Sequence, residues 1–252
     1  SELAAVHLTS ANSINIARLI PQTFYYFWAY AQLKTKGKKN VIFSVPSGNF
    51  GNVLGAFYAK EMGLPIEKLL VASNENNILT EWINTGIYDI RNKELKLTKS
   101  PAMDILKSSN IERVIYSLFG ANRTKELMED LNKNNIFKMS KNETEQLQKY
   151  FSAIYSNDTF GAKTIKEFLD IGYLMDPHTA TCIKAYNELK EKPLKTVIYS
   201  TAEWTKFSPT VLNALNENST KYADKEALEE ISLKYNATLP QSIKDLDRKS
   251  VV

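Results

Sequence analysis

The chain has 252 residues, and at about 150 residues per domain this length predicts one large domain, or one domain with an appendage. Hydrophobic residues make up 43% and charged residues 24% of the sequence, which excludes wholesale disorder. The formal net charge of +4 is too small to indicate a nucleic-acid partner.

Few residues in this sequence suit metal or disulfide chemistry. One cysteine cannot form an intrachain disulfide, so we expect a reducing compartment, the cytoplasm. One cysteine and two histidines in the whole sequence are too few for a His/Cys zinc cage, and no metal site is predicted. The most apolar long stretch, Ile14 to Leu33, contains Arg18 and Pro21 and does not suit a membrane span. Because the sequence begins without methionine, we also expect a truncated or processed chain.

The first third of the chain predicts alternating helices and strands. A helix is expected from Ala11 to Lys36, and the following residue, Gly37, is expected to end it. Val41 to Val45 is a short apolar run, typical of a strand buried on both faces. A helix from Val53 to Met62 and a second strand from Ile66 to Ala72 follow. Strand, helix and strand within about 32 residues make one βαβ unit.

The middle of the chain is more polar and its apolar spacing predicts helices. These run over Ile111 to Phe119, Thr124 to Leu131, Asn142 to Ile154 and Thr164 to Leu169, with a break at Gly120. A helix from Thr179 to Leu189 then leads to a strand from Thr196 to Tyr199. The alternation predicts an α/β fold with a mainly parallel, twisted sheet flanked by helices, and additional helices beyond it. We expect a large domain over residues 1–216, with a helical insertion around 100–160, and a carboxyl-terminal helical tail over 217–252 packed on it.

The sharpest local feature is the segment from Pro46 to Asn52, between the first strand and the next helix. Gly48 and Gly51 are expected to let the backbone turn with positive φ and expose successive N–H groups, and the helix start adds its own. Such a turn at the carboxyl end of a strand is typical of a phosphate cradle. The glycine spacing fits neither a Walker loop nor a dinucleotide fingerprint. A strand-to-helix turn without a ligand is the alternative.

Two further segments carry polar groups at element ends. Asn12 and Ser13 precede the first helix and Arg18 lies about one turn onward, so they suit either a phosphate or simple helix capping. Thr201 follows the last strand, where a hydroxyl either faces a ligand or only ends the strand. Asp176 predicts a helix cap, with a packed or hydrogen-bonded His178 after it.

Together these segments resemble threonine synthases, pyridoxal-phosphate enzymes of the tryptophan-synthase-β fold group, over their carboxyl-terminal half. The resemblance covers about positions 10 to 210. It runs through Ser10-Ala11-Asn12-Ser13-Ile14-Asn15 with Arg18, Pro21 and Gln22; Pro46-Ser47-Gly48-Asn49-Phe50-Gly51-Asn52; Gly63-Leu64-Pro65; Thr85-Gly86 with Tyr88; Asp176-Pro177-His178-Thr179-Ala180; and Ser200-Thr201-Ala202 with Lys206-Phe207.

The resemblance implies a role for each motif. Gly48, Asn49, Phe50, Gly51 and Asn52 match the loop that holds the phosphate of the pyridoxal-phosphate cofactor through backbone N–H groups, and Thr201 matches the hydroxyl that meets the pyridine nitrogen. Asn12, Ser13 and Arg18 match positions that bind the phosphate of O-phospho-L-homoserine. The family converts this substrate and water into L-threonine and phosphate. No membrane or nucleic-acid partner is implied.

The chain also departs from the family pattern. Glu203-Trp204-Thr205 stands where His-Pro-Ala is common, which leaves the roles of those side chains open. The family's Schiff-base lysine lies in a Phe-Lys-Asp segment before the first motif, and no such segment occurs here. We therefore assign no catalytic residue and expect the fragment to be inactive without the missing amino-terminal half. The alternatives are another pyridoxal-phosphate lyase of the fold group, such as a serine/threonine dehydratase, or a non-catalytic anion-binding scaffold domain.

Overall fold

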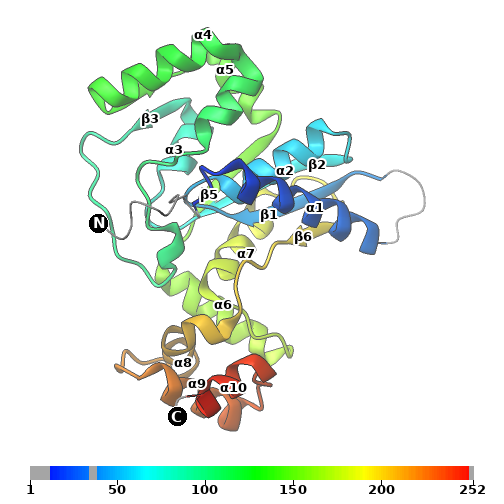
Figure 1. Ribbon diagram of the computed structural model, residues 1–252, viewed down its shortest axis with the longest axis vertical. Coiled ribbons are helices and arrows are strands. Elements are labelled where there is room, and N and C mark those ends of the chain that lie inside the picture. Colours follow the sequence, from blue (N-terminus) through cyan, green and yellow to red (C-terminus); the bar gives the residue numbers. More distant parts are fainter. Residues whose placement is uncertain (1–11, 34–38, 250–252) are drawn as a thin grey trace, which may run out of the picture.

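A computed structural model describes residues 12–33 and 39–249 and shows a parallel sheet at the centre of the chain (Figure 1). Its strands are β1 (Val41–Pro46), β2 (Ile66–Ser73), β5 (Phe151–Tyr155) and β6 (Thr196–Ile198). They lie in the order β5-β2-β1-β6, and every neighbouring pair is parallel. The predicted α/β class with a mainly parallel sheet is confirmed.

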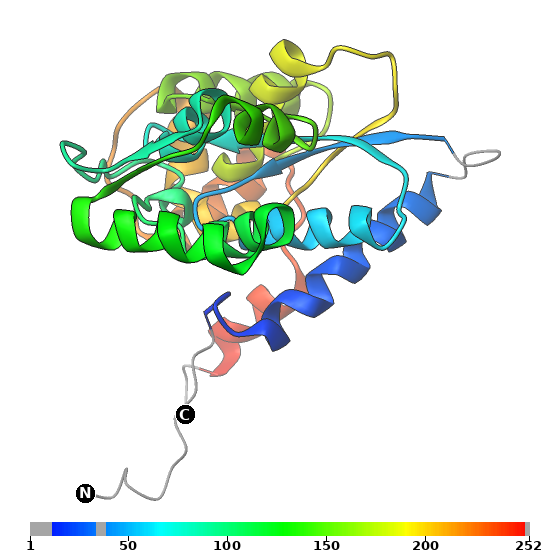
Figure 2. The ribbon, with the colours of Figure 1, turned by 90° about the horizontal axis from the view of Figure 1, so that it is seen from above.

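Helices cover both faces of this sheet. α1 (Ile16–Gln32) packs along α2 (Gly51–Glu61), and α2 contacts β1 and β2 (Figure 2). Alternate residues of β1 face different clusters, since Phe43 joins the core beneath α2 while Ile42 meets Cys182 of α7 (Pro177–Leu189). Burial on both faces explains the unbroken apolar run that predicted this strand.

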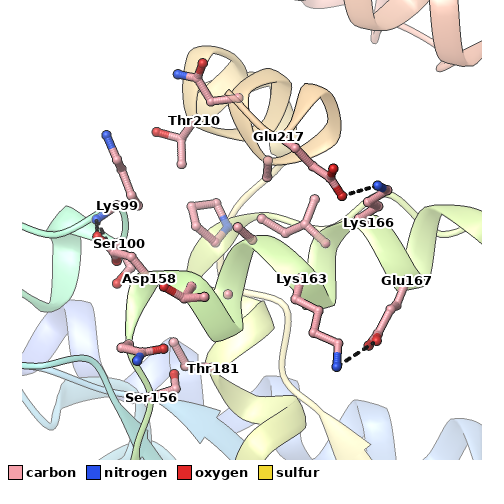
Figure 3. A pocket seen from close by; sticks show the side chains of 18 of the residues that line it. Lys99, Ser100, Ser156, Asp158, Lys163, Lys166, Glu167, Thr181, Thr210 and Glu217 are labelled. Carbon is pink, nitrogen blue, oxygen red and sulfur yellow. Dashed lines mark hydrogen bonds and ion pairs between the residues drawn. The ribbon is translucent and has the colours of Figure 1, made fainter. Parts of the chain in front are cut away.

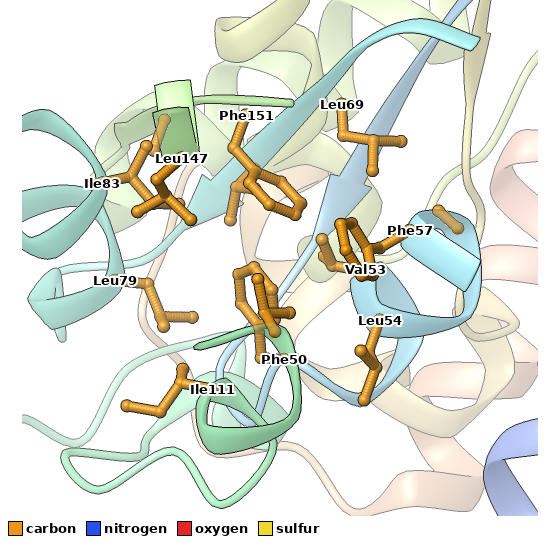
Figure 4. Close-up of a cluster of buried hydrophobic side chains, with 14 of the residues drawn as sticks. Phe50, Val53, Leu54, Phe57, Leu69, Leu79, Ile83, Ile111, Leu147 and Phe151 are labelled. Carbon is orange, nitrogen blue, oxygen red and sulfur yellow. The ribbon is translucent and has the colours of Figure 1, made fainter. Parts of the chain in front are cut away.

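The main core lies between α2, the sheet and a set of elements that follow β2. Figure 4 shows its aromatic centre, where Phe50, Phe57 and Phe151 come together. The surrounding elements include a small antiparallel sheet of β3 and β4. Their bounds are α3 (Ile78–Thr85), β3 (Ile87–Asp89), η2 (Pro101–Met103), α4 (Ile111–Asn134), β4 (Ile136–Lys138) and α5 (Lys141–Gln148).

A second core lies at the carboxyl-terminal end of the molecule, at the bottom of Figure 1. There Ile165, Leu212 and Ile231 are buried together. The division of the chain at residue 216 stays a prediction; the structure shows α9 packed on α8. The elements of this end are α6 (Asp158–Asp170), η3 (Trp204–Phe207), α8 (Ser208–Asn216), α9 (Asp224–Tyr235) and α10 (Gln241–Lys249).

Several predicted boundaries change. The helix expected over Asn142 to Ile154 is wrong, because α5 ends at Gln148 and Phe151–Tyr155 forms β5 beside β2. The insertion around residues 100–160 therefore contains strands as well as helices. The expected break at Gly120 is confirmed, since its φ of 78° interrupts α4. The helix expected over Ala11 to Lys36 is described as α1 over Ile16–Gln32, and Ala11 and residues 34–38 lie outside the described residues. Among the residues that are described, no helix is long and apolar enough to cross a membrane.

Candidate functional site

The loop between β1 and α2 is anchored by an aromatic ring. Phe50 has a φ of 63°, a left-handed conformation that is unfavourable for a bulky residue, and it is fully buried. Its ring packs edge-on against Trp82 and Phe151, with centroids 5.8 Å and 5.4 Å away. The core therefore holds the backbone turn in place, and the strained residue lies at the loop predicted to bind phosphate.

Two glycines of this loop have no room for a side chain. A Cβ at Gly48 would lie 2.7 Å from the Cα of Met103. A Cβ at Gly51 would lie 2.9 Å from the Cβ of Ser13. The positive φ expected at these glycines is wrong, since Phe50 is the residue of this loop that adopts it. Glycine is required here by close packing, so neither position tolerates another residue without a shift of its neighbours.

The backbone N–H groups of the loop are available. Among the described residues, no hydrogen bond uses the N–H of Gly48, Asn49, Phe50, Gly51 or Asn52. Phe50 is the N-cap of α2 and contributes no capping side-chain bond. Unused N–H groups and the positive end of the helix dipole favour an anion at this point.

The Asn49 side chain joins this loop to the segment before α1. Its Nδ2 donates to Ser13 Oγ at 2.8 Å, and its Oδ1 accepts from the backbone N and the Oγ of Ser109, at 2.7 Å and 2.9 Å. Asn110 Nδ2 donates to Ser13 Oγ and to the Asn49 carbonyl, at 2.8 Å and 3.0 Å. The structure therefore brings together Ser13 and Asn49, which belong to two separate predicted segments; their roles as phosphate ligands stay a prediction.

The start of α4 completes this network. Arg113 donates to the carbonyls of Ser13 and Ile14, at 3.1 Å and 2.6 Å, and Ser108 Oγ donates to the Gly48 carbonyl at 2.5 Å. The sequence reasoning missed Ser108, Ser109, Asn110 and Arg113. Their one sequence signal is a Ser-Ser-Asn run before an apolar helix, which predicts a helix start but no contact with residues 60 or more positions away.

The segment before α1 differs from the capping alternative. Asn15, rather than Ser13, caps α1, because its side chain accepts from the N–H of Ala17 at 3.0 Å. Asn12 Oδ1 accepts from the N–H of Ile14 at 3.3 Å. Arg18 lies in the first turn of α1 at an exposed position. Ser13 is thus engaged with the loop, and Arg18 follows it closely along the chain.

The other end of the loop meets two tyrosines. Asn52 Oδ1 accepts from the Tyr26 hydroxyl at 2.6 Å, and the Tyr26 ring stacks on Tyr199 with centroids 5.2 Å apart. Burial raises the pKa of Tyr199 to about 12. Thr201 is exposed and lies three residues beyond Ile198, which pairs with Ser44 of β1. Thr201 therefore lies at the same edge of the sheet as the loop.

Asp176 and His178 hold the segment that covers Gly48. Asp176 caps α7, as predicted, and its Oδ1 lies 2.9 Å from His178 Nδ1. His178 Nε2 accepts from the N–H of Ala102 at 3.1 Å, so the proton is assigned to Nδ1. Ala102 precedes Met103, the residue against Gly48. His178 is buried and hydrogen-bonded, as the sequence indicated.

Comparisons with known proteins agree with this geometry. The chain is 38% identical to threonine synthase of Saccharomyces cerevisiae over 264 aligned positions, which take in 96% of this chain and 51% of the yeast protein. The pyridoxal-phosphate-bound threonine synthase structure from Brucella melitensis superposes with a TM-score of 0.81 at 35% identity, over 94% of this chain and 50% of that one. The chain is homologous to threonine synthases.

Other comparisons extend this result. The yeast threonine synthase structure superposes with a TM-score of 0.79, over 94% of this chain and 48% of that one. The human protein named threonine synthase-like 1 is 41% identical over 217 residues, 82% of this chain and 29% of that protein. No family model matches the chain. The chain thus spans about half the length of the threonine synthases that it matches.

Proposed function

We propose that this chain is the carboxyl-terminal part of a pyridoxal-phosphate-dependent threonine synthase, a cytoplasmic enzyme that converts O-phospho-L-homoserine and water into L-threonine and phosphate. The observation that carries the proposal is the loop from Gly48 to Asn52 at the start of α2, whose N–H groups enter no hydrogen bond with any residue that the structure describes. Homology to threonine synthases supports pyridoxal phosphate and phosphohomoserine as the ligands of this proposed anion site.

The residues present suit pyridoxal phosphate. The N–H groups of the loop would hold its phosphate, and the close packing of Gly48 against Met103 and of Gly51 against Ser13 fixes the backbone that presents them. The Thr201 hydroxyl would meet the pyridine nitrogen, and a neutral hydroxyl favours protonation of that nitrogen less than a carboxylate would. When bound, the cofactor supplies an electron sink for the reacting carbons.

The substrate phosphate would be received by Asn12, Ser13 and Arg18. Amide groups of Asn49 and Asn110 donate to the Ser13 hydroxyl, whose own proton is donated to Asn12 Oδ1 at 3.3 Å and would turn to a phosphate oxygen when the substrate binds. The Arg18 guanidinium would add a charge-assisted hydrogen bond. These groups orient the substrate; the lysine that carries the cofactor is expected from the missing half.

The exposed face of α1 supports a missing half as partner. Ile16, Ile20, Phe24 and Trp28 recur every four residues, and each is 47% to 67% exposed. A contiguous apolar stripe of this kind on a helix is typical of an interaction surface. We infer that the remainder of the enzyme packs here, beside the loop that binds the cofactor.

A binding and activity assay on the 252-residue chain tests the proposal. We expect pyridoxal phosphate to bind weakly, to bind less to a Gly51→Ala variant, and to support no threonine formation from phosphohomoserine. Turnover near that of a complete enzyme would contradict the missing-lysine argument. Binding of inorganic phosphate without any binding of pyridoxal phosphate would favour the scaffold alternative.

The substrate assignment is tested in the complete enzyme. Arg18→Ala should weaken the handling of phosphohomoserine by about 10- to 100-fold, because a charge-assisted bond to phosphate is lost, while pyridoxal-phosphate affinity is retained. Arg91→Ala is the control, since Arg91 is an exposed arginine paired with Asp89 on another part of the chain. Equal kinetic constants for the Arg18 variant and the parent would remove Arg18 from the substrate site.

A further inference from the structure

A cavity of about 740 Å³ lies beside α6, apart from the loop at α2. Its walls come from α6, from α8, from the start of α7 and from residues 99–100. Figure 3 shows Ser156, Asp158 and Thr181 along one side, with Thr210 and Glu217 opposite. None of the residues predicted to bind cofactor or substrate lines it. Its size is that of a small-molecule site.

Two oxygen atoms of residues that line this cavity have no hydrogen-bond partner among the described residues. Ser156 is only 4% exposed, and its Oγ is buried and unpartnered. Asn213 Oδ1 is likewise buried and unpartnered. Because buried polar groups are nearly always hydrogen-bonded, an unpartnered hydroxyl on a cavity wall points to a ligand that would bond to it. Ser156 also follows β5, at the edge where parallel sheets bind ligands.

The start of α6 adds charged and dipolar groups next to this hydroxyl. Asn157 caps Phe160, whereas the N–H groups of Asp158 and Thr159 enter no hydrogen bond among the described residues. The Asp158 carboxylate accepts from the backbone N–H of Lys99 at 3.1 Å and forms no ion pair in this part of the chain. Burial raises the pKa of Asp158, which shows a partly desolvated carboxylate.

The charges at the rim behave differently. Lys163 pairs with Glu167, and Lys166 pairs with Glu217. The Lys99 ammonium, by contrast, forms no ion pair within the described residues. At the start of α6, one carboxylate and one ammonium, Asp158 and Lys99, are therefore left for a ligand of both charges; Asp170, at the other end of this helix, also forms no ion pair among the described residues. The lining also includes the apolar residues Ala162, Ile165, Pro177 and Ala214.

We propose that this cavity binds a free α-amino acid with an apolar side chain. The Asp158 carboxylate receives its ammonium group. The Ser156 hydroxyl, the first N–H groups of α6 and Lys99 receive its carboxylate, and the apolar wall covers its side chain. Each unpartnered group at the start of α6 then has a partner of the chemistry it requires.

Calorimetric titration of the 252-residue chain tests this site. The probes are L-leucine, L-methionine and L-phenylalanine at up to about 10 mM, with isocaproate and isoamylamine as leucine analogues lacking the amino or the carboxyl group. At least one amino acid should bind, and for leucine each analogue should bind at least about 10-fold more weakly. If no amino acid binds, or isocaproate binds as tightly as leucine, the proposal is wrong.

Variants locate the site within the chain. Asp158→Asn should weaken binding about 10- to 100-fold, because it removes the charge but keeps an oxygen for the Lys99 N–H. Ser156→Ala should weaken binding about 3- to 10-fold without lowering the thermal stability of the ligand-free chain. Asp130→Asn, on the exposed face of α4, is the charge-matched control. Parent affinity in the Asp158 variant would overturn the assignment even if an amino acid binds.

Discussion

The loop at α2 and the cavity at α6 both lie at carboxyl ends of parallel strands, but they differ in how far their polar side chains are hydrogen-bonded. Around the loop, Ser13, Asn49 and Asn110 satisfy one another. In the cavity, the Oγ of Ser156 has no partner among the described residues. A closed side-chain network fixes a backbone shape and leaves the N–H groups to a ligand, whereas an unpartnered hydroxyl itself offers the bond.

The largest expected difference between the two regions is in the unfolding free energy of glycine variants. Gly48→Ala should lower the free energy of unfolding by about 2–3 kcal/mol, because the new Cβ would meet the Met103 backbone. Gly161→Ala should raise it by about 0.5–1 kcal/mol, since Gly161 is inside α6 and a Cβ there meets nothing within 4 Å. Urea unfolding measures both values. Similar values for the two variants would show that the loop is not tightly packed.

Serine variants in the two regions should differ in unfolding free energy by a smaller amount. Ser13→Ala should cost about 1–2 kcal/mol of unfolding free energy, because two amide groups lose their acceptor. Ser156→Ala should change the same quantity by less than about 0.5 kcal/mol, because no bond among the described residues is broken. Chemical unfolding of both variants beside the parent decides. A Ser156 variant that loses as much as the Ser13 variant would mean that its hydroxyl already has a partner.

The smallest effects are in the alkaline titration of two tyrosines. Burial raises the pKa of Tyr199 from 10 to about 12, so the folded chain keeps a proton that the unfolded chain loses between these values. Tyr199 therefore stabilises fully below pH 10, and this contribution is lost as the pH rises towards 12. Tyr199→Phe should reduce the pH dependence of unfolding by up to one proton in this window.

Tyr222, at the carboxyl-terminal end, is the matched control. Hydrogen bonds from Asn218 and Asn216 lower the pKa of its hydroxyl, so its ionisation has the opposite linkage. Tyr222→Phe should remove one tyrosinate from the early part of the absorbance titration, and Tyr199→Phe one from the late part, to which the buried Tyr26 and Tyr88 also contribute. Identical titration curves for the two variants would contradict the difference in environment.

Much of the fold was predictable where burial is local and periodic. The run from Val41 to Val45 indicated a doubly buried strand, and the structure has one over Val41–Pro46. β5 escaped prediction because Leu147, Phe151 and Ile154 recur at helical spacing although the last two lie in a strand. Only pairing with β2, about 80 positions earlier, decides between the two, and a local pattern does not contain that contact.

The candidate site shows the same limit. Gly48 and Gly51 were recognisable because glycines gather in turns before a helix, but the structure requires them for close packing and places the positive φ at Phe50. Asn110 and Arg113 were not, since an amide and a guanidinium in a helix's first turn are ordinary surface residues until the fold brings them to Ser13. Likewise, the lack of a hydrogen-bond partner for Ser156 among the described residues depends on the folded surroundings, so it is not predictable from the sequence.

The single cysteine has a practical consequence. Cys182 is fully buried under the sheet, and burial raises the pKa of its thiol far above the ordinary range. A buried neutral thiol reacts slowly with alkylating reagents, so these reagents should label the native protein very little. A cysteine introduced at an exposed position such as Thr201 would then carry a fluorophore or spin label at one site. The edge of the sheet where we propose that the cofactor binds can thus be labelled without first removing native thiols.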